Sequence, residues 1–140
     1  MKHNALKISL LIVAFCALLM MPSNASIEAS DYLSSYGAYI TKSGNVISIH
    51  FEVEGTRRMD YLGVTHIYLY ERASSNDSWS HVKTYLSSDP LYESDMMGTN
   101  TTFKMDSVTY SGTSTYQYKA YVTVYAEKDG GSDSRSIVAN

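Results

Sequence analysis

Hydrophobic and polar residues alternate along several stretches of the chain, most clearly in NVISIHFEVEG (residues 45–55). Two sets of side chains face opposite ways there: the apolar Ile47, Ile49, Phe51 and Val53, and the polar Ser48, His50, Glu52 and Glu54. Because successive side chains of a strand point to opposite faces of the sheet, this period of two predicts a half-buried β-strand. Outside the N-terminus no segment keeps a helical spacing, so helices are not expected beyond a stray turn.

Turn-forming clusters separate the alternating stretches and divide the chain into short strands. These clusters are rich in Gly, Ser, Asn and Asp. They read TKSGN, SSNDS, SSDP, YSGTS and EKDGGSDS. The spacing predicts an all-β fold, an antiparallel immunoglobulin-like or fibronectin type III-like sandwich. About seven strands are expected, at residues 33–41, 45–54, 64–72, 79–86, 101–110, 116–127 and 133–138.

Two segments fit the strand pattern less well. Residues 54–63 (EGTRRMDYLG) are interpreted as a longer connection that folds over one end of the sandwich. Residues 86–100 form the longest irregular piece, and loops of that length are often functional or mobile. In that piece Met96 and Met97 are interpreted as closing one end of the core, with an exposed adaptable contact as the alternative. In residues 101–110, Phe103 and Met105 share one face.

The strand at 116–127 contains four tyrosines that alternation divides between its two faces. Tyr116 and Tyr118 fall with the small apolar side chains that face the core, namely Ala120, Val122, Val124 and Ala126. Tyr121 and Tyr125 fall on the opposite face. Tyr118, or else Tyr116, is the candidate for a tyrosine corner, in which a buried ring bonds nearby backbone through its hydroxyl. The glycines of EKDGGSDS suit a turn that needs positive φ.

The N-terminus has the pattern of a secretory signal peptide. Lys2, His3 and Lys7 precede an apolar run from Ile8 to Met21, which PSNAS follows. Residues 1–25 are therefore expected to be removed after Ala25, leaving one domain at 26–140 in the extracellular space. An N-terminal anchor is the alternative, but the run is shorter than the ~20 apolar residues that span a bilayer.

Composition narrows the chemistry of the mature chain. The only cysteine, Cys16, lies inside the apolar run, which argues against a lipid anchor and leaves the domain without disulfides or thiolate sites. Without Lys2 and Lys7, nine Lys and Arg remain against fourteen Asp and Glu, a net charge of −5. This charge argues against nucleic acid or an anionic membrane as partner. No membrane insertion is expected after cleavage, and the protein is expected to be a monomer that is released freely.

Several segments together carry a resemblance to known proteins. The segments that carry this resemblance are GVTHIYLYE, then W and VKTY, then MMGTN and VTYSGTSTYQYKAYVTVYAEKDGGSDS. Through them the chain resembles a family of small exported bacterial proteins of uncharacterised function. The resemblance covers Tyr36 to the C-terminus and implies export and a single β-sandwich, with no activity to carry over. IYLYER followed by W, and the YAEKDGG ending, are also similar to fibronectin type III modules.

Motifs for catalysis and metal binding are absent from the sequence. His50, His66 and His81 lie on different predicted strands without a second ligand at metal-binding spacing. No GxSxG elbow occurs, and neither acidic cluster, Asp89/Glu93/Asp95 or Asp129/Asp133, has the register of an EF-hand loop. No enzymatic activity, cofactor or metal is therefore expected.

Aromatic side chains are the remaining feature of the sequence that indicates a function. Thirteen tyrosines occur with one tryptophan, and Tyr68, Tyr70, Tyr121 and Tyr125 are expected on outward faces. If strands 64–72 and 116–127 are neighbours, these rings form one patch, which suits protein or glycan binding; ladders that only stabilise the sheet are the alternative. The expected function is a binding module for an extracellular protein or glycan. The alternatives are a secreted bacteriocin-like effector or inhibitor acting through residues 86–100, and a small glycan hydrolase with paired acids.

Overall fold

The computed structural model describes residues 30–140, and the predicted signal peptide, its cleavage site after Ala25 and Cys16 lie outside them. The fold is all-β and antiparallel, as predicted, with one short helix, α2 (Glu93–Met96). Its strands are β1 (Leu33–Ser43), β2 (Val46–Arg72), β3 (Ser80–Leu86), β4 (Met97–Ser111), β5 (Gln117–Lys128) and β6 (Gly131–Ala139).

The strand count differs from the predicted seven because β2 runs through two predicted strands and the segment between them. Residues 54–63 are not a connection over the end of the fold, as predicted, but the bend of this one strand. Between Glu54 and Met59, β2 has four residues, whereas β4 has only Thr102 between their partners Phe103 and Thr101. Such extra residues make a strand bend and twist without leaving the sheet. Met59 is fully buried inside the bend, and Arg57 and Arg58 are exposed on its outside.

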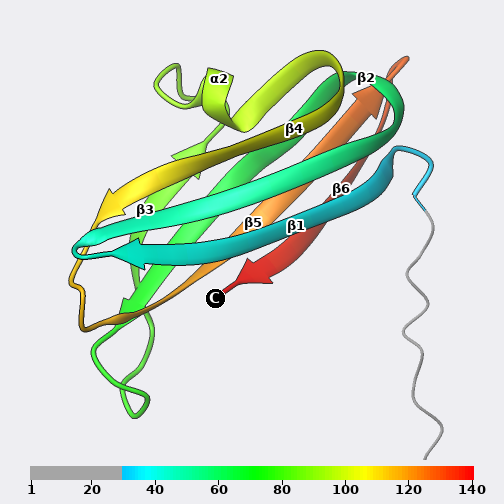
Figure 1. Cartoon of the computed structure of the whole chain (residues 1–140). Coiled ribbons are helices and arrows are strands. Elements are labelled where there is room, and N and C mark those ends of the chain that lie inside the picture. The colour runs from blue at the N-terminus through cyan, green and yellow to red at the C-terminus, as the bar shows by residue number, and fades with distance from the viewer. Residues whose placement is uncertain (1–29) are drawn as a thin grey trace, which may run out of the picture.

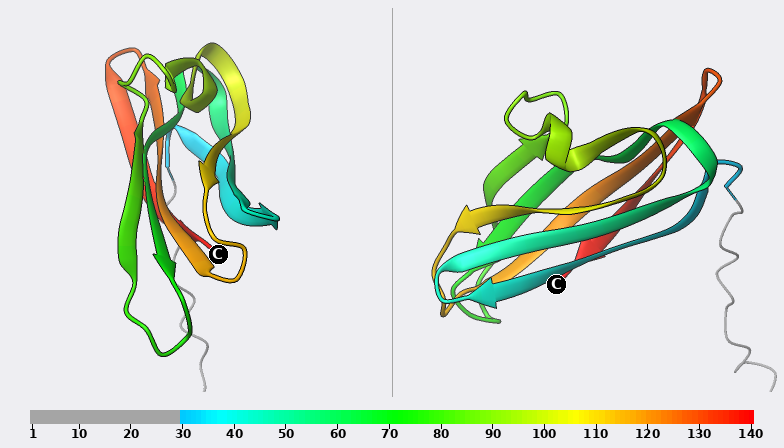
Figure 2. Two further views of the ribbon diagram at one scale, coloured as in Figure 1. Left: turned by 90° about the vertical axis from the view of Figure 1, so that its left-hand side faces the viewer. Right: turned by 45° about the horizontal axis from the view of Figure 1, so that its top comes forward.

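All six strands belong to one hydrogen-bonded sheet that curls into a half-barrel with two facing layers (Figures 1 and 2). The first half of β2 pairs with β1 and β4, and its second half pairs with β3 and β5. β6 adds to β5, and the Ile40 N–H of β1 donates to the Asn140 carbonyl at 3.4 Å where these edges approach. The finer prediction of an immunoglobulin-like or fibronectin type III-like sandwich is not confirmed.

The core fills the space between the two layers. Both halves of β2 contribute fully buried side chains, including Ile49 and Phe51 from the first and Ile67 and Leu69 from the second. From β5 the predicted inward set is buried: Tyr118, Ala120, Val122, Val124 and Ala126, with Tyr116 partly buried against them. No polar or charged residue of the described chain is buried.

The β5–β6 hairpin turns where the glycine-rich segment predicts it. Asp129 and Gly130 both have positive φ, 54° and 80°, which is the geometry of a two-residue hairpin turn. Asp60, in the β2 bend, accepts hydrogen bonds from Lys128 Nζ at 2.8 Å and from the Asp129 N–H at 2.9 Å. The tip of this hairpin is thereby attached to the bend of β2.

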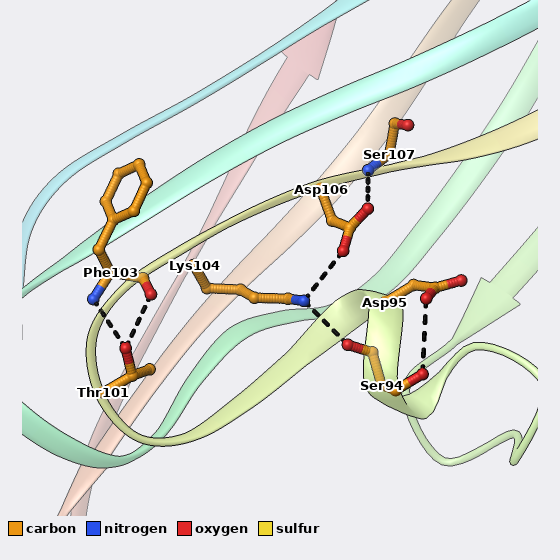
Figure 3. A network of polar contacts seen from close by, with 7 residues as sticks. All are labelled: Ser94, Asp95, Thr101, Phe103, Lys104, Asp106 and Ser107. Carbon is orange, nitrogen blue, oxygen red and sulfur yellow. Dashed lines mark hydrogen bonds and ion pairs between the residues drawn. The ribbon is translucent and has the colours of Figure 1, made fainter.

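Residues 86–100 are packed onto the fold by α2. Met96 is fully buried and Met97 partly buried, so Met96 closes one end of the core. In Figure 3, Lys104 Nζ of β4 donates to the Ser94 carbonyl of α2 at 2.8 Å and to Asp106 Oδ2 at 3.1 Å. Asp106 in turn accepts from the Ser107 N–H through its other oxygen. The helix is therefore fixed to the strand that follows it.

Candidate functional site

The register of β2 with β5 brings predicted site residues together. Tyr68 and Tyr121 are direct cross-strand partners, and each keeps 39% of its surface exposed. The Tyr70 ring meets the Tyr121 ring edge to face, with their centroids 5.6 Å apart. Three of the four tyrosines predicted to form a patch therefore lie side by side on the outer surface of the sheet.

Histidines of β2 and β3 extend the same surface. The His81 ring lies 5.3 Å from the Tyr70 ring and 6.2 Å from the Tyr68 ring, and it bonds the Thr84 hydroxyl at 2.9 Å. On the other side of Tyr68, the His66 ring stacks at 6.0 Å. These histidines are arranged by aromatic contacts, and the surface runs without interruption across β3, β2 and β5.

Two cations and Trp79 complete the surface at one end. The Arg72 guanidinium lies 4.4 Å from the centroid of the Trp79 ring, and Lys119 Nζ lies 4.6 Å from it. Lys119 Nζ is also 5.3 Å from the Tyr121 ring and 5.9 Å from the Tyr70 ring. Aromatic faces attract cations at such distances. We call the set of Tyr68, Tyr70, Tyr121, Trp79, His66, His81, Arg72 and Lys119 the aromatic face.

Tyr125, the fourth predicted contact residue, lies outside this group. It is opposite Gly63 rather than another ring, four residues along β5 from Tyr121. Its hydroxyl donates to Glu127 Oε2, and this hydrogen bond is the main reason that the pKa of Tyr125 is raised. The hydroxyl of Tyr125 is thus already bonded within the domain.

Trp79, Arg72 and Lys119 are members of the aromatic face that sequence reasoning missed. Arg72 is the last residue of β2 and lies two residues after Tyr70, so alternation could have placed it on this face. Trp79 lies in the connection just before β3, and its contacts with Arg72 and Lys119 depend on the course of that connection. Lys119 lies two residues before Tyr121 and therefore on the same face, so alternation alone could have placed it there.

Tyr118 contributes to the fold through its buried ring and its hydrogen-bonded hydroxyl. Its buried hydroxyl accepts a hydrogen bond from the Thr113 N–H at 2.7 Å and lies 3.1 Å from the Thr113 carbonyl, to which it donates. Burial is the largest cause of its raised pKa. Tyr116, the second candidate, is partly buried, and its own carbonyl accepts from Lys42 Nζ at 2.9 Å.

A second group of exposed side chains lies on the outer surface of the other layer. Phe103 and Met105 of β4 do share a face, and it is the outward one, with 46% and 62% of their surfaces exposed. On β1, Tyr39 is 56% exposed and stacks on His50 of β2 at 4.7 Å. These residues are spread over the layer and carry no cation–aromatic contact of the kind that Lys119 makes.

The two acidic clusters that were compared with an EF-hand calcium loop contain residues that contact other groups of the protein. Asp129 lies 3.5 Å from Lys128, and Asp133 lies 2.6 Å from Arg135. Asp89 accepts from the Leu91 N–H in a turn. Within residues 30–140 no group of three or more His, Cys, Asp or Glu is arranged to hold a metal ion. In the same range, no helix has the length and apolar character required to cross a bilayer.

Comparisons with other proteins found no relative that would assign a role to this surface. No model of a known protein family, no curated protein and no solved structure matches the chain. The resemblance to small exported bacterial proteins therefore stays a prediction, and the aromatic face has to be interpreted from its own chemistry.

Proposed function

We propose that the mature chain is a secreted, non-catalytic binding module that contacts an extracellular protein or glycan through the aromatic face. The observation that carries this proposal is the continuity of exposed rings across three strands, from His81 through Tyr70 and Tyr68 to Tyr121. Tyrosine supplies rigid contact area with a polar tip, so it loses little entropy on binding.

A purely structural role explains this arrangement less well. Cross-strand pairs such as Tyr68 and Tyr121 do stabilise a sheet. Stability alone, however, does not account for the cations at one end, because Lys119 and Arg72 are placed around Trp79 at the rim of the surface. Rings with adjacent polar donors are typical of recognition surfaces.

A relation to immunoglobulin-like or fibronectin type III-like modules is part of the same proposal. Two observations support it: the packing of two β layers over one core, and the Tyr118 hydroxyl that bonds backbone five residues upstream, as in a tyrosine corner. The main departure is β2, which passes through both layers as one strand.

The test is a comparison of three proteins on an array of neutral polysaccharides, acidic polysaccharides and purified cell-envelope proteins. The double variant Tyr68→Ser/Tyr121→Ser removes the two most exposed tyrosines of the aromatic face. Tyr39→Ser is the control, because it removes an even more exposed tyrosine, 56% against 39%, from the other layer. We expect wild type and Tyr39→Ser to bind the same ligand and the double variant to bind it at least about tenfold more weakly.

Equal binding by all three proteins contradicts the proposal, and so does the absence of any binding by the wild type. Circular dichroism and thermal unfolding of each variant separate loss of binding from loss of the fold.

A further inference from the structure

The polar side chains of the aromatic face share one property: none of them is a carboxylate. Around the rings, the outward polar residues of β2, β3 and β5 are His66, His81, Arg72, Lys119, Gln117, Thr84 and Thr123. Glu71 points to the inner side, beside the Tyr118 hydroxyl, and Glu127 lies at the far end with Tyr125. In a chain with fourteen Asp and Glu against eleven Lys and Arg, this surface is locally neutral to positive.

Lys119 has no acidic partner within residues 30–140, in contrast to three other cations of the fold. Lys104, Lys128 and Arg135 each lie within 3.1 Å of a carboxylate oxygen. Lys119 Nζ lies instead among the rings of Trp79, Tyr121 and Tyr70, at 4.6, 5.3 and 5.9 Å from their centroids. Cation–aromatic attraction fixes the position of the ammonium group without neutralising it. Its charge remains available to an anionic group of a ligand.

We infer that the ligand of the aromatic face is an acidic polysaccharide, a chain of sugars that carry carboxylate groups. This inference rests on the proposed function and specifies its ligand class. Sugar rings pack their C–H faces on Tyr68 and Tyr121, and a sugar carboxylate accepts a charge-assisted hydrogen bond from Lys119. Sugar hydroxyls meet Thr84 and Thr123, and beyond them Ser134 and Ser136 of β6, which pair with Tyr125 and Thr123.

Two other anionic partners fit this surface less well. Single-stranded nucleic acid is held along its backbone by a groove of several cations, whereas this open sheet surface has two, Arg72 and Lys119, in a mature chain of net charge −5. An acidic peptide gains most of its affinity from side-chain anchors in apolar pockets. Here the only exposed aliphatic neighbour of Tyr121 across the β5–β6 pair is Val138, on an open sheet surface.

The only tryptophan of the chain reports on this surface directly. Trp79 lies 4.6 Å from Lys119 Nζ, so its fluorescence should change when a ligand binds there. The full-length mature protein is titrated with polygalacturonate, with a neutral dextran of similar length, with polyglutamate and with oligo-dT. We expect binding to polygalacturonate, with affinity that falls as salt rises because the ionic contact is screened. Dextran should bind at least about tenfold more weakly, because it offers no carboxylate to Lys119.

Lys119→Gln removes the charge and keeps a long polar side chain. We expect it to weaken polygalacturonate binding by about tenfold or more, which is the usual loss for one charge-assisted hydrogen bond. Arg57→Gln is the matched control, since it removes an exposed cation from the bend of β2 and should leave the affinity unchanged. Lys119→Arg keeps the charge and should retain most of the affinity. Thermal unfolding shows whether each variant is folded.

The outcomes separate this inference from the proposed function. If dextran binds as well as polygalacturonate and Lys119→Gln has no effect, the acidic ligand class is wrong, and the proposed function stands when Tyr68→Ser/Tyr121→Ser abolishes binding. Preferential binding of polyglutamate or oligo-dT also overturns the inference. If no polyanion or glycan binds while the array finds a protein ligand, only the inference fails. Absence of all binding overturns both.

Discussion

Tyr118 joins the core to the loop that precedes β5. The ring is buried with the inward residues of that strand, and its hydroxyl forms two hydrogen bonds with the backbone of Thr113. The ring also fills the space beside Gly112, where an added Cβ would lie 2.3 Å from the hydroxyl. Loop and strand are therefore fitted to each other through one side chain.

Tyr118→Phe tests the energetic contribution of these hydrogen bonds. The substitution keeps the ring and leaves the Thr113 N–H without its partner, so we expect the free energy of unfolding to fall by about 1–2 kcal/mol in urea denaturation. Tyr116→Phe is the control, because the Tyr116 hydroxyl has no hydrogen bond within residues 30–140. Its effect should stay within about 0.5 kcal/mol. Equal effects of the two substitutions would show that the hydroxyl of Tyr118 contributes nothing specific.

Alternation predicted the faces of single residues well where a strand is regular. The division of β5 into inward and outward tyrosines follows from the period of two and agrees with the burial of Tyr118 and the exposure of Tyr121. The predicted strand 79–86 included Trp79, which lies just before β3, but alternation could not predict that its ring meets Arg72 and Lys119. Alternation also grouped Tyr125 with Tyr121, because a period of two gives the face of a residue and not its distance from a cluster.

At the scale of elements, Gly63 allows three strands to meet. Like Tyr61 and Leu62 before it, Gly63 of β2 pairs with both neighbouring strands, and its partners are Met97 of β4 and Tyr125 of β5. A Cβ at this position would lie 2.1 Å from the carbonyl oxygen of Met96, which belongs to α2. Since that oxygen is backbone, the clash cannot be relieved by rotating a side chain.

Gly63→Ala should therefore be strongly destabilising. We expect a loss of about 2–3 kcal/mol or more in the free energy of unfolding, the usual cost of forcing atoms into a packed site. Gly37→Ala is the matched control in β1, where the nearest atom to an added Cβ is a Glu52 side-chain oxygen at 3.4 Å. We expect that substitution to change stability by no more than about 1 kcal/mol. A tolerated Gly63→Ala would contradict the close approach of α2 to β2.

The contact between the β2 bend and the β5–β6 hairpin predicts a dependence on pH. The hydrogen bond from Lys128, with that from the Asp129 N–H, holds the pKa of Asp60 below its usual 3.8. The same partner raises the pKa of Lys128 above 10.5. A carboxyl group whose pKa is lower in the folded state than in the unfolded state stabilises the fold at pH values above its unfolded-state pKa. This contribution is lost as the pH falls through its folded-state pKa. A lysine whose pKa is higher in the folded state stabilises the fold at pH values below its unfolded-state pKa. This contribution is lost as the pH rises through its folded-state pKa.

The measurement is a double-mutant cycle of Asp60→Asn and Lys128→Gln in urea, repeated across pH. We expect a coupling between the two residues that is constant from about pH 5 to 9 and declines as the pH falls below 3.8, where Asp60 takes up its proton. Both side chains are partly exposed to solvent, so the coupling should also shrink as salt is raised. A coupling that does not decline at any pH below 3.8 at which the protein stays folded would contradict an ionic contact.

The elements themselves were largely predictable from the sequence, but their connection was not. Six of the seven expected strand regions can be traced in β1 and β3–β6 and in the first half of β2, and the seventh is the second half of β2. In residues 55–58 the alternation fails, as it also does in a loop. The chain stays in the sheet because Gly55 pairs with Leu33 of β1 and because pairing with β4 resumes at Met59, and such nonlocal pairing is not encoded in local periodicity.

At the scale of the whole molecule, the long bent strand unites the two layers. The first layer contributes Ile49 and Phe51 to the core and the second contributes Ile67 and Val122, all of them 1% exposed or less. Because β2 continues from one layer into the other and both bury their apolar side chains against each other, neither layer has a core of its own. The domain should therefore unfold in one cooperative step.

Ile49→Ala tests this cooperativity with two probes that see different parts of the molecule. Far-UV circular dichroism follows the whole sheet, and Trp79 fluorescence follows the aromatic face in the other layer from Ile49. Deleting this buried side chain should lower the free energy of unfolding by about 2–5 kcal/mol. Since the layers share one core, both midpoints in urea should shift together and coincide.

Val46→Ala, at an exposed position near the start of the same strand, is the control and should shift neither midpoint appreciably. A fluorescence midpoint that stays in place while the circular dichroism midpoint falls would mean that the second layer holds its structure without the first. The curl of β2 would then connect two separate folding units. If the midpoints coincide, the aromatic face depends for its geometry on side chains of the opposite layer.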